Sequence, residues 1–327
     1  MTFTRRAALA ATALSGALLL AACGGSSDSG STTADPTNTG GSDLTGSVRI
    51  DGSSTVFPLT ATAAEDFMAA NPGVQVTVAS SGTGGGFEKF CRGETDANDA
   101  SRPVKDDEAA NCEAAGIEFG QLTVATDALT VVVNPANDWA TCLTIEELAK
   151  IWAPDSTVNN WNQVRDGFPD EALSLFGPGT DSGTFDYFTD VVNGEEGASR
   201  ADYTPSEDDN VIVQGVAGSP GGLGYFGFTY FEENADQLKA VEIDSGSGCV
   251  APSADAARDG SYEPLARPLF VYPSVQALQQ PQVRAFFEYY VANDAAIAEG
   301  ALYIPLSEEG QAQLVADLDA LLAKAGS

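Results

Sequence analysis

The sequence predicts an α/β fold with parallel sheets, and three observations support this class. Strand-like and helix-like segments alternate, as where residues 48–50 and 74–78 flank a helix-like run at 56–70. Turns rich in Gly, Ser and Thr stand between strand and helix. A short apolar run at 129–133 has the composition of a buried strand. In such folds, sites gather at the carboxyl ends of the strands.

The elements follow in chain order. Residues 48–50 form a strand, and the helix at 56–70 ends before the breaker Asn71-Pro72-Gly73. Residues 74–78 alternate between apolar and polar side chains, as a half-buried strand does. The remaining predicted elements are a polar helix near 105–115, a strand at 129–133, a Thr-capped helix at 144–152, a strand at 173–176, a helix at 185–192 and a strand at 268–272.

Four polar turns predict a shared anion site. They lie at 51–55, 80–86, 97–103 and 177–187, each after a strand-like segment and before a helix-like one. A helix start leaves backbone N–H groups unpaired at the positive end of the helix dipole, which favours an anion. Ser, Thr and Asp are also the preferred N-caps, so each turn has capping as its simpler explanation. Four such turns in one chain favour the site.

The N-terminus predicts export and a lipid anchor. Arg5-Arg6 precede an apolar run at 7–20, followed by Leu20-Ala21-Ala22-Cys23. A basic start, a short apolar core and small residues indicate a signal peptide at residues 1–22 rather than a membrane span. The last four residues resemble the lipobox of bacterial lipoproteins, in which the cysteine is acylated. An ordinary secretory signal with an incidental Cys23 is the alternative.

A flexible linker is expected after the anchor. Residues 23–45 are rich in Gly, Ser, Thr and Asp and cannot bury a core. The ordered part therefore starts near Gly46, and its length suits two domains. Four cysteines remain in this part, an even number that fits disulfides in an oxidising compartment and allows three pairings. Zinc is disfavoured because the chain has no C-x-x-C spacing and no histidine.

Charge and composition narrow the function classes. The formal net charge of −32 makes nucleic-acid binding improbable. With no histidine, Ser-His-Asp and Cys-His catalysis and the usual transition-metal sites are excluded. No D-x-D-x-D-G calcium loop is present, although calcium can be held in other ways. We expect neither a metal nor a cofactor.

Six segments resemble the phosphate-binding lipoproteins of phosphate ABC transporters. The resemblance covers residue 46 to the end. It implies a type II periplasmic-binding-protein fold, in which two α/β lobes joined by two crossover strands close on a ligand. Lobe one is expected at 46–127 and 268–327 and lobe two at 128–267, with crossovers at 129–133 and 268–272. The six segments are residues 51–58, 80–87, 100–103, 177–188, 202–210 and 222–227.

The disulfide pairing rests on this architecture. Pairing Cys91 with Cys112 and Cys142 with Cys249 keeps each bridge within one lobe. The aromatic residues at 225–231 are expected in the core rather than against a ligand.

Site residues transfer from the family unevenly. The first-turn pair corresponds to Ser54 and Thr55, and the second-turn serine to Ser81. The fourth turn corresponds to residues 182–184, that is Ser182, Gly183 and Thr184. In the better-known branch an aspartate follows the Ala-Ser of the third turn, but here Ser101 is followed by Arg102. That branch also has an arginine where this chain has Pro178.

Because the family's aspartate and arginine are both replaced in this chain, the residues that make the charged contacts with phosphate must be sought at other positions. Arg102 is the candidate for the positive charge, and Asp181, or else Asp99, for the acceptor of the phosphate proton. An ion pair of Arg102 with Asp106 or Asp107 is the alternative. Arg200 is a second candidate cation.

The sequence thus predicts a monomeric receptor that binds inorganic phosphate and delivers it to an ABC-transporter permease. It would be exported, anchored through Cys23 to the outer face of the cell membrane, and would catalyse nothing. Another oxyanion such as sulfate is the alternative ligand. A secreted phosphatase would need metal ligands or an activated nucleophile. A sensing lipoprotein of the same fold that transports nothing is a third possibility.

Overall fold

A computed structural model describes residues 44–180 and 182–326 of the chain. The expected signal peptide, Cys23, Asp181 and the linker up to residue 43 lie outside the described residues. Within those residues, no helix is both long and apolar enough to cross a membrane. The α/β class is confirmed, because strands and helices alternate along most of the chain up to α7 (Phe228–Glu233).

One twisted mixed sheet runs through the described residues. Its hydrogen-bonded order is β2-β1-β3-β12-β4-β8-β6-β7, and β9 pairs with β4 off this path. The β2-β1-β3 and β8-β6-β7 groups are parallel, as predicted. The strands are β1 (Gly46–Gly52), β2 (Val74–Val78), β3 (Ala97–Ala100), β4 (Leu122–Val133), β6 (Ser174–Gly177), β7 (Thr204–Pro205), β8 (Gly222–Gly227), β9 (Lys239–Ala240) and β12 (Ala266–Pro273).

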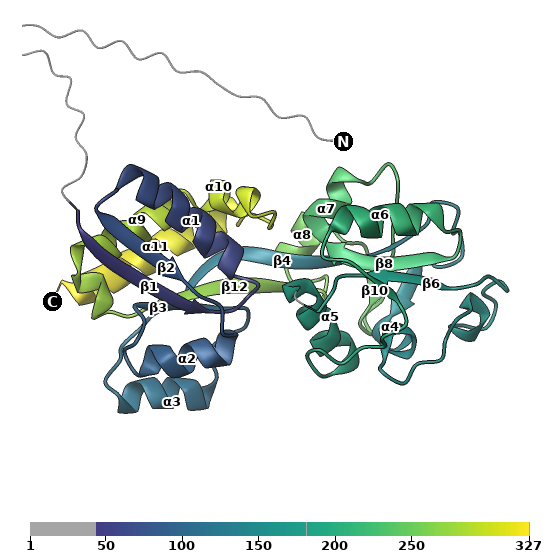
Figure 1. Ribbon diagram of the computed structural model, residues 1–327, viewed down its shortest axis with the longest axis horizontal. Coiled ribbons are helices and arrows are strands. Elements are labelled where there is room, and N and C mark those ends of the chain that lie inside the picture. The colour runs from purple at the N-terminus through teal and green to yellow at the C-terminus, as the bar shows by residue number, and fades with distance from the viewer. Residues whose placement is uncertain (1–43, 181, 327) are drawn as a thin grey trace, which may run out of the picture. The chain divides into compact units, whose positions relative to one another are not determined.

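The strands β4 and β12 are the crossovers between the two parallel groups (Figure 1). They pair antiparallel, with Asp127 opposite Arg267, and the second half of β4 pairs with β8. The predicted crossover segments at 129–133 and 268–272 fall within these strands. We call residues 46–127 and 268–327 the first lobe and 128–267 the second; these bounds stay predictions.

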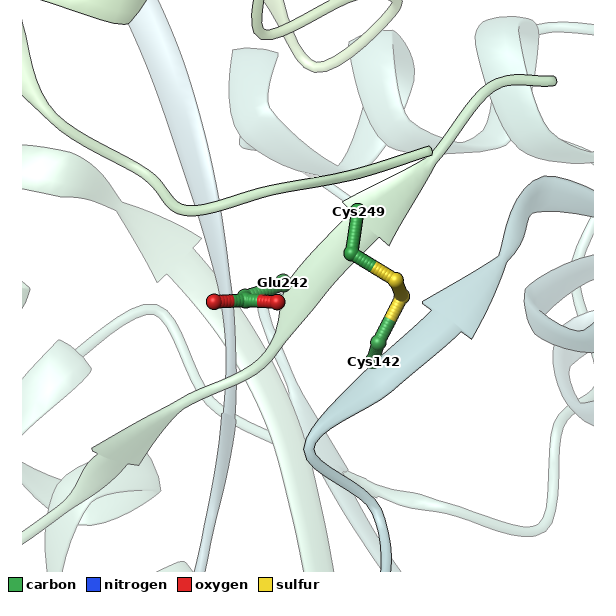
Figure 2. A group of neighbouring side chains, drawn as sticks. All are labelled: Cys142, Glu242 and Cys249. Atoms are coloured by element: carbon green, nitrogen blue, oxygen red, sulfur yellow. A yellow bond between two sulfur atoms is a disulfide. The ribbon is translucent and has the colours of Figure 1, made fainter. Parts of the chain in front are cut away.

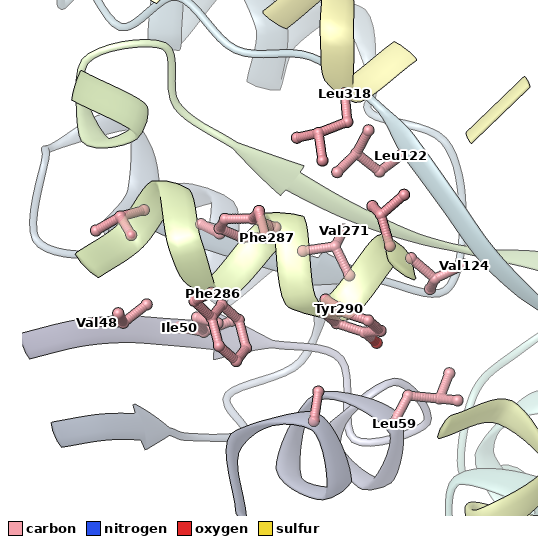
Figure 3. Packing of buried hydrophobic residues seen from close by; sticks show 14 of the residues in the cluster. Val48, Ile50, Leu59, Leu122, Val124, Val271, Phe286, Phe287, Tyr290 and Leu318 are labelled. Atoms are coloured by element: carbon pink, nitrogen blue, oxygen red, sulfur yellow. The ribbon is translucent and has the colours of Figure 1, made fainter. Parts of the chain in front are cut away.

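In the first lobe, helices cover both faces of the β2-β1-β3 group (Figure 1). Figure 3 shows Ile50 of β1 beside Phe286 of α9 in the larger apolar core. Burying a side chain of this size contributes roughly 1.5–3 kcal/mol. The helices of this lobe are α1 (Phe57–Ala70), α2 (Thr83–Cys91), α3 (Asp106–Ala114), α9 (Pro281–Ala292), α10 (Asp294–Gly300) and α11 (Glu308–Ala325), with the 3-10 turn η2 (Ala277–Gln279).

In the second lobe, the core is rich in aromatic rings. Tyr225 stacks on Phe188 with ring centres 3.7 Å apart, and Trp152 packs edge-on against both. The rings at 225–231 are thus core residues, as predicted, although Tyr230 and Phe231 are only partly buried. The helices of this lobe are α4 (Ile145–Trp152), α5 (Gly183–Asn193), α6 (Asp209–Gly218), α7 (Phe228–Glu233) and α8 (Ala254–Arg258), with the 3-10 turn η1 (Trp161–Gln163).

Two disulfides confirm the predicted pairing. Cys91–Cys112 joins α2 to α3, and Cys142–Cys249 joins two strands of a small second sheet. That sheet has the order β11-β10-β5, formed by β5 (Cys142–Thr144), β10 (Glu242–Asp244) and β11 (Cys249–Val250). Figure 2 shows Glu242 beside the second bridge. In the described part of the chain this is the one group of three or more possible metal ligands, and both of its sulfurs are bonded to each other.

Candidate functional site

A cleft of about 580 Å³ is lined by parts of both lobes. The first three polar turns supply one side, α5 of the second lobe supplies another, and the crossover strand β12 contributes Arg267. Five of the predicted site residues line this cleft, namely Ser54, Thr55, Ser81, Ser101 and Arg102. The predicted convergence of the first three turns is therefore present in the structure.

Hydrogen bonds within the first turn and to neighbouring segments hold its backbone in place. The backbone N–H of Ser53 donates to the carbonyl of Asp99 at 2.9 Å, and that of Thr55 donates to Ser53 Oγ at 3.2 Å. Gly52 has φ 142°, and a Cβ there would lie 2.1 Å from the Asp99 carbonyl oxygen. Only glycine fits so close an approach. Tyr303 adds a hydrogen bond from its hydroxyl to the Thr55 carbonyl at 2.7 Å.

In the second turn, the Ser81 hydroxyl is already engaged. It donates to Asp51 Oδ1 at 2.7 Å, and Lys89 and the Gly52 N–H also donate to this carboxylate. Burial alone would raise the pKa of Asp51, but these hydrogen bonds outweigh it and lower the pKa below its usual value. While the Ser81 hydroxyl donates its proton to Asp51, it offers only lone pairs to the cleft. It could donate to an anion only if this hydrogen bond were broken.

The start of α2 brings the second and third turns together. Thr83 and the two glycines that follow it line the cleft at the N-terminal end of this helix, where N–H groups lack helical partners. Thr83 Oγ1 accepts the Ser101 N–H at 3.2 Å and lies 3.3 Å from its hydroxyl. This arrangement offers backbone donors and two hydroxyls to an anion.

Arg102 lines the cleft but is bound to a neighbouring carboxylate. Its two terminal nitrogens donate to Glu108 at 2.9 and 2.7 Å in a bidentate pair. The sequence pointed to Asp106 or Asp107 as the alternative partner; the structure places Glu108 there instead, because the third residue of α3 faces back toward the turn. Burial raises the pKa of Glu108, but the Arg102 hydrogen bond helps to lower it overall. Much of the Arg102 charge is thereby neutralised.

Ser182, Gly183 and Thr184 of the fourth turn lie off the lining of the cleft. Ser182 caps α5, accepting the Thr184 N–H at 3.2 Å. Gly183 faces the first turn so closely that a Cβ would lie 2.8 Å from Thr55 Oγ1. Thr184 instead lines a separate cavity of about 170 Å³ that also contains Asp127. Of these three residues, Gly183 thus lies against the first turn, and none of them lines the main cleft.

The first turns of α5 present different groups to the cleft. Asp186, Tyr187 and Asp190 line it, joined by Glu196 from the segment after the helix. Burial and the neighbouring Glu196 raise the pKa of Asp186, while Arg267 opposes the rise. None of these acids was among the predicted site residues, because nothing in a helical segment marks which face will meet another lobe.

Arg267 is the main site residue that the sequence did not indicate. Its Nη2 donates to Thr55 Oγ1 at 3.0 Å, and its Nε to Asp127 Oδ2 at 3.3 Å. Its guanidinium carbon lies 3.6 Å from the centre of the Tyr187 ring. Burial raises the pKa of Asp127, and Arg267 offsets part of that rise. The residue stands in a strand without any turn motif, so only its position identifies it.

Two other candidates lie away from the cleft lining. Arg200 donates twice to Asp202 and also to the carbonyls of Ile151 and Val158, so it holds the second lobe together. Asp99 is fully buried and accepts a hydrogen bond from Thr60 at 3.0 Å. Burial raises its pKa to about 8. The backbone carbonyl of Asp99 accepts the Ser53 N–H of the first turn, while the Asp99 carboxyl is buried and does not reach the cleft lining.

Comparison with known proteins shows the family. Residues 29–294 match the model of the PBP superfamily domain. Protein SphX of a Synechocystis strain is 48% identical over 80% of this chain and 79% of its own length. The phosphate-binding protein PstS of Staphylococcus saprophyticus is 35% identical over 96% of this chain and 94% of its own.

A solved structure agrees in fold. The crystal structure of a possible phosphate binding protein from Planctomyces limnophilus is 47% identical, with a TM-score of 0.83 over 86% of this chain and all of that one. The type II periplasmic-binding-protein fold expected from the sequence is thereby confirmed, and the relatives are binding proteins rather than enzymes. The chain belongs to the PBP superfamily, in the family of substrate-binding proteins that includes PstS and SphX.

Proposed function

We propose that this protein binds inorganic phosphate in the cleft and delivers it to the permease of an ABC transporter for import. One observation carries the proposal: three Ser/Thr/Gly turns, the N-terminal end of α2 and two arginines converge on a single cleft between two lobes. Donors of this kind stabilise an anion without depending on the net charge of the protein, which is strongly negative. The relatives named as phosphate-binding proteins support phosphate as the anion.

The proposed contacts are those that the sequence predicted. Ser54, Thr55, Ser81, Ser101 and Arg102 already line the cleft. Residues 181–184 would join them from the second lobe when the cleft closes. Gly183 already lies against Thr55, so a small displacement of α5 relative to the first turn would change which groups meet the anion. Asp181 is the proposed acceptor of the phosphate proton.

The proposed location follows from the N-terminal sequence. Acylation at Cys23 would anchor the exported chain to the outer face of the cell membrane, with residues 24–45 as a tether. The protein would work there as a monomer that meets the permease subunits at the membrane. For such a receptor, the tether must be long enough for the folded part to contact the permease, and no membrane-spanning helix is required.

Calorimetric titration of the full chain tests the binding proposal. We expect phosphate to bind with micromolar affinity or better and sulfate to bind at least tenfold more weakly. Equal binding of both anions would make the protein a general oxyanion receptor, and no binding of phosphate would overturn the proposal. Turnover of a chromogenic phosphate ester would instead support the phosphatase.

A further inference from the structure

We propose that Arg267, rather than Arg102, is the main cation that holds the anion, and that it does so together with the Thr55 hydroxyl. This inference rests on the proposed function, because it assigns a specificity-determining contact within the same cleft. Three cationic side chains line the cleft, namely Arg102, Lys105 and Arg267. Their ion pairs and their exposure to water differ, and these differences show which of the three is best placed to bind an anion.

Arg102 and Lys105 are the weaker candidates. Both terminal nitrogens of Arg102 are engaged by Glu108, whose own side chain is only 14% exposed. Recruiting Arg102 to an anion would leave that carboxylate without its partner. Lys105 is exposed at the N-cap of α3, where water screens its charge. Neither position gives a desolvated charge that is free to bind.

Arg267 combines burial with unused donors. Its side chain is 17% exposed, and its carboxylate partner Asp127 is contacted through Nε alone, at 3.3 Å. Nη2 gives one N–H to Thr55. Among residues 44–180 and 182–326, Nη1 has no hydrogen-bond acceptor. A guanidinium has five N–H donors in a fixed fork, so an edge suited to two oxygens of a tetrahedral anion remains.

Thr55 completes the geometry. Its Oγ1 accepts a hydrogen bond from Arg267, so the hydroxyl proton stays free to donate to an anion oxygen. Ser81 is the opposite case, because its hydroxyl donates to Asp51. Arg267 and Thr55 therefore present adjacent donors at one place in the cleft. Charge-assisted hydrogen bonds of this kind are stronger than neutral ones in a site that excludes water.

The orientation of Arg267 is fixed from both lobes. Tyr187 of α5 covers one face of the guanidinium, and Asp127 and Thr55 hold its edge. Thr55 belongs to the first lobe, Tyr187 to the second, and Arg267 to a crossover strand. A side chain held this way loses little further freedom on binding, which favours affinity.

Phosphate titration of four single variants of the full chain tests the assignment. Arg267→Met should weaken binding about ten- to a hundredfold, the loss expected for a charge-assisted contact. The phosphate affinity of Arg267→Lys should lie between those of Arg267→Met and the wild type, because lysine keeps the positive charge but lacks the planar set of guanidinium donors. Arg102→Met should lose less than threefold. Arg284→Met removes a charge from an exposed pair on α9 and is the matched control, expected to bind as the wild type does.

A double variant serves as the control for a loss of folding stability in Arg267→Met. Arg267→Met leaves the buried Asp127 carboxylate without its cation, which can lower stability. Arg267→Met with Asp127→Asn removes that charge and should restore thermal stability while phosphate binding stays weak. If the double variant binds within threefold of the wild type, Arg267 acts only by neutralising Asp127, and the assignment is overturned.

The remaining outcomes are also decisive. A larger loss in Arg102→Met than in Arg267→Met would return the role to Arg102. If the wild type binds phosphate and Arg267→Met binds equally well, this assignment fails and the proposed function stands. If the wild type does not bind phosphate at all, the proposed function itself fails.

Discussion

The Thr60 hydroxyl donates a hydrogen bond to Asp99 Oδ1 across 3.0 Å, in a place where neither residue has exposed surface. The other carboxyl oxygen of Asp99 has no partner within the described residues. Burial raises the pKa of Asp99 to about 8; the hydrogen bond from Thr60 opposes the rise, and the nearby Asp51 adds to it. The folded protein therefore keeps this carboxyl protonated at a pH where an unfolded chain has released the proton.

Stability is accordingly expected to fall as pH rises from 5 to 8. In this window the folded state binds more protons at Asp99 than the unfolded state, so the free energy of unfolding decreases with pH. The stabilisation is fully present below the unfolded pKa and is lost as pH rises through the folded pKa. One such group contributes up to about 1.4 kcal/mol per pH unit.

Asp99→Asn should flatten this dependence and stabilise the protein most at pH 8. Urea unfolding at several pH values measures the effect. The buried Asp294 and the partly buried Asp209 also have raised pKa values, so the wild-type slope contains their share. Asp319→Asn, at an exposed position of α11, is the control. Parallel stability curves for the wild type and Asp99→Asn would show that Asp99 titrates alike in both states.

Discrimination between phosphate and sulfate is expected to depend on Asp181. A carboxylate can accept a hydrogen bond from protonated phosphate but only repels sulfate, which has no proton near neutral pH. Asp181→Asn should therefore weaken phosphate and lower the phosphate-to-sulfate affinity ratio about tenfold. Titration calorimetry with both anions gives the ratio.

Two matched variants locate the acceptor if Asp181 is not the one. Asp186 lines the cleft, so Asp186→Asn tests another carboxyl of this region. Asp99 is enclosed beneath the first turn, and we expect Asp99→Asn to leave the ratio unchanged. A ratio that collapses only in Asp186→Asn would move the role to that residue, and a collapse only in Asp99→Asn would move it to the buried one.

Phosphate is expected to close the cleft. The cleft, of about 580 Å³, is far larger than one tetrahedral anion, and both lobes contribute to its lining. Contacts with both lobes at once favour the closed state, by the differential affinity of the anion for it. Small-angle scattering should show a smaller radius of gyration with phosphate than with chloride. An identical profile, with binding shown by calorimetry, would mean that the anion is held without closure.

Membrane retention is expected to depend on Cys23. In a bacterial host that processes lipoproteins, Cys23→Ala should leave the protein unprocessed or off the membrane fraction, because the acylated thiol is the proposed anchor. Cell fractionation followed by mass measurement checks both outcomes. The wild-type chain is the control, and normal processing with full retention of the variant would refute the anchor.

Much of the fold could be predicted because its signals are local. The helix expected at 56–70 is α1 (Phe57–Ala70), and the strand expected at 74–78 is β2 (Val74–Val78). Thr144 caps α4 through a capping box with Glu147, as its sequence indicates. Each of these features depends on side chains a few residues apart. Sequence spacing alone is therefore enough to find them.

The candidate site was predictable only in part, because side-chain directions depend on tertiary packing. The first three turns line the cleft as expected, yet Thr184 opens into another cavity and Ser182 serves as a cap. Successive residues at a helix start point in different directions. Which of them faces the anion depends on how α5 packs against the first lobe.

The sequence by itself determined the α/β class, the polar turns and the family, because periodicity, capping and motif order are written in neighbouring residues. Only the tertiary structure decided that Arg267 meets Thr55, 212 positions away in the chain. That contact depends on the register that sets Arg267 opposite Asp127 across β12 and β4. A one-residue slip would turn the arginine to the other face of the sheet, and no local pattern in the sequence specifies this register.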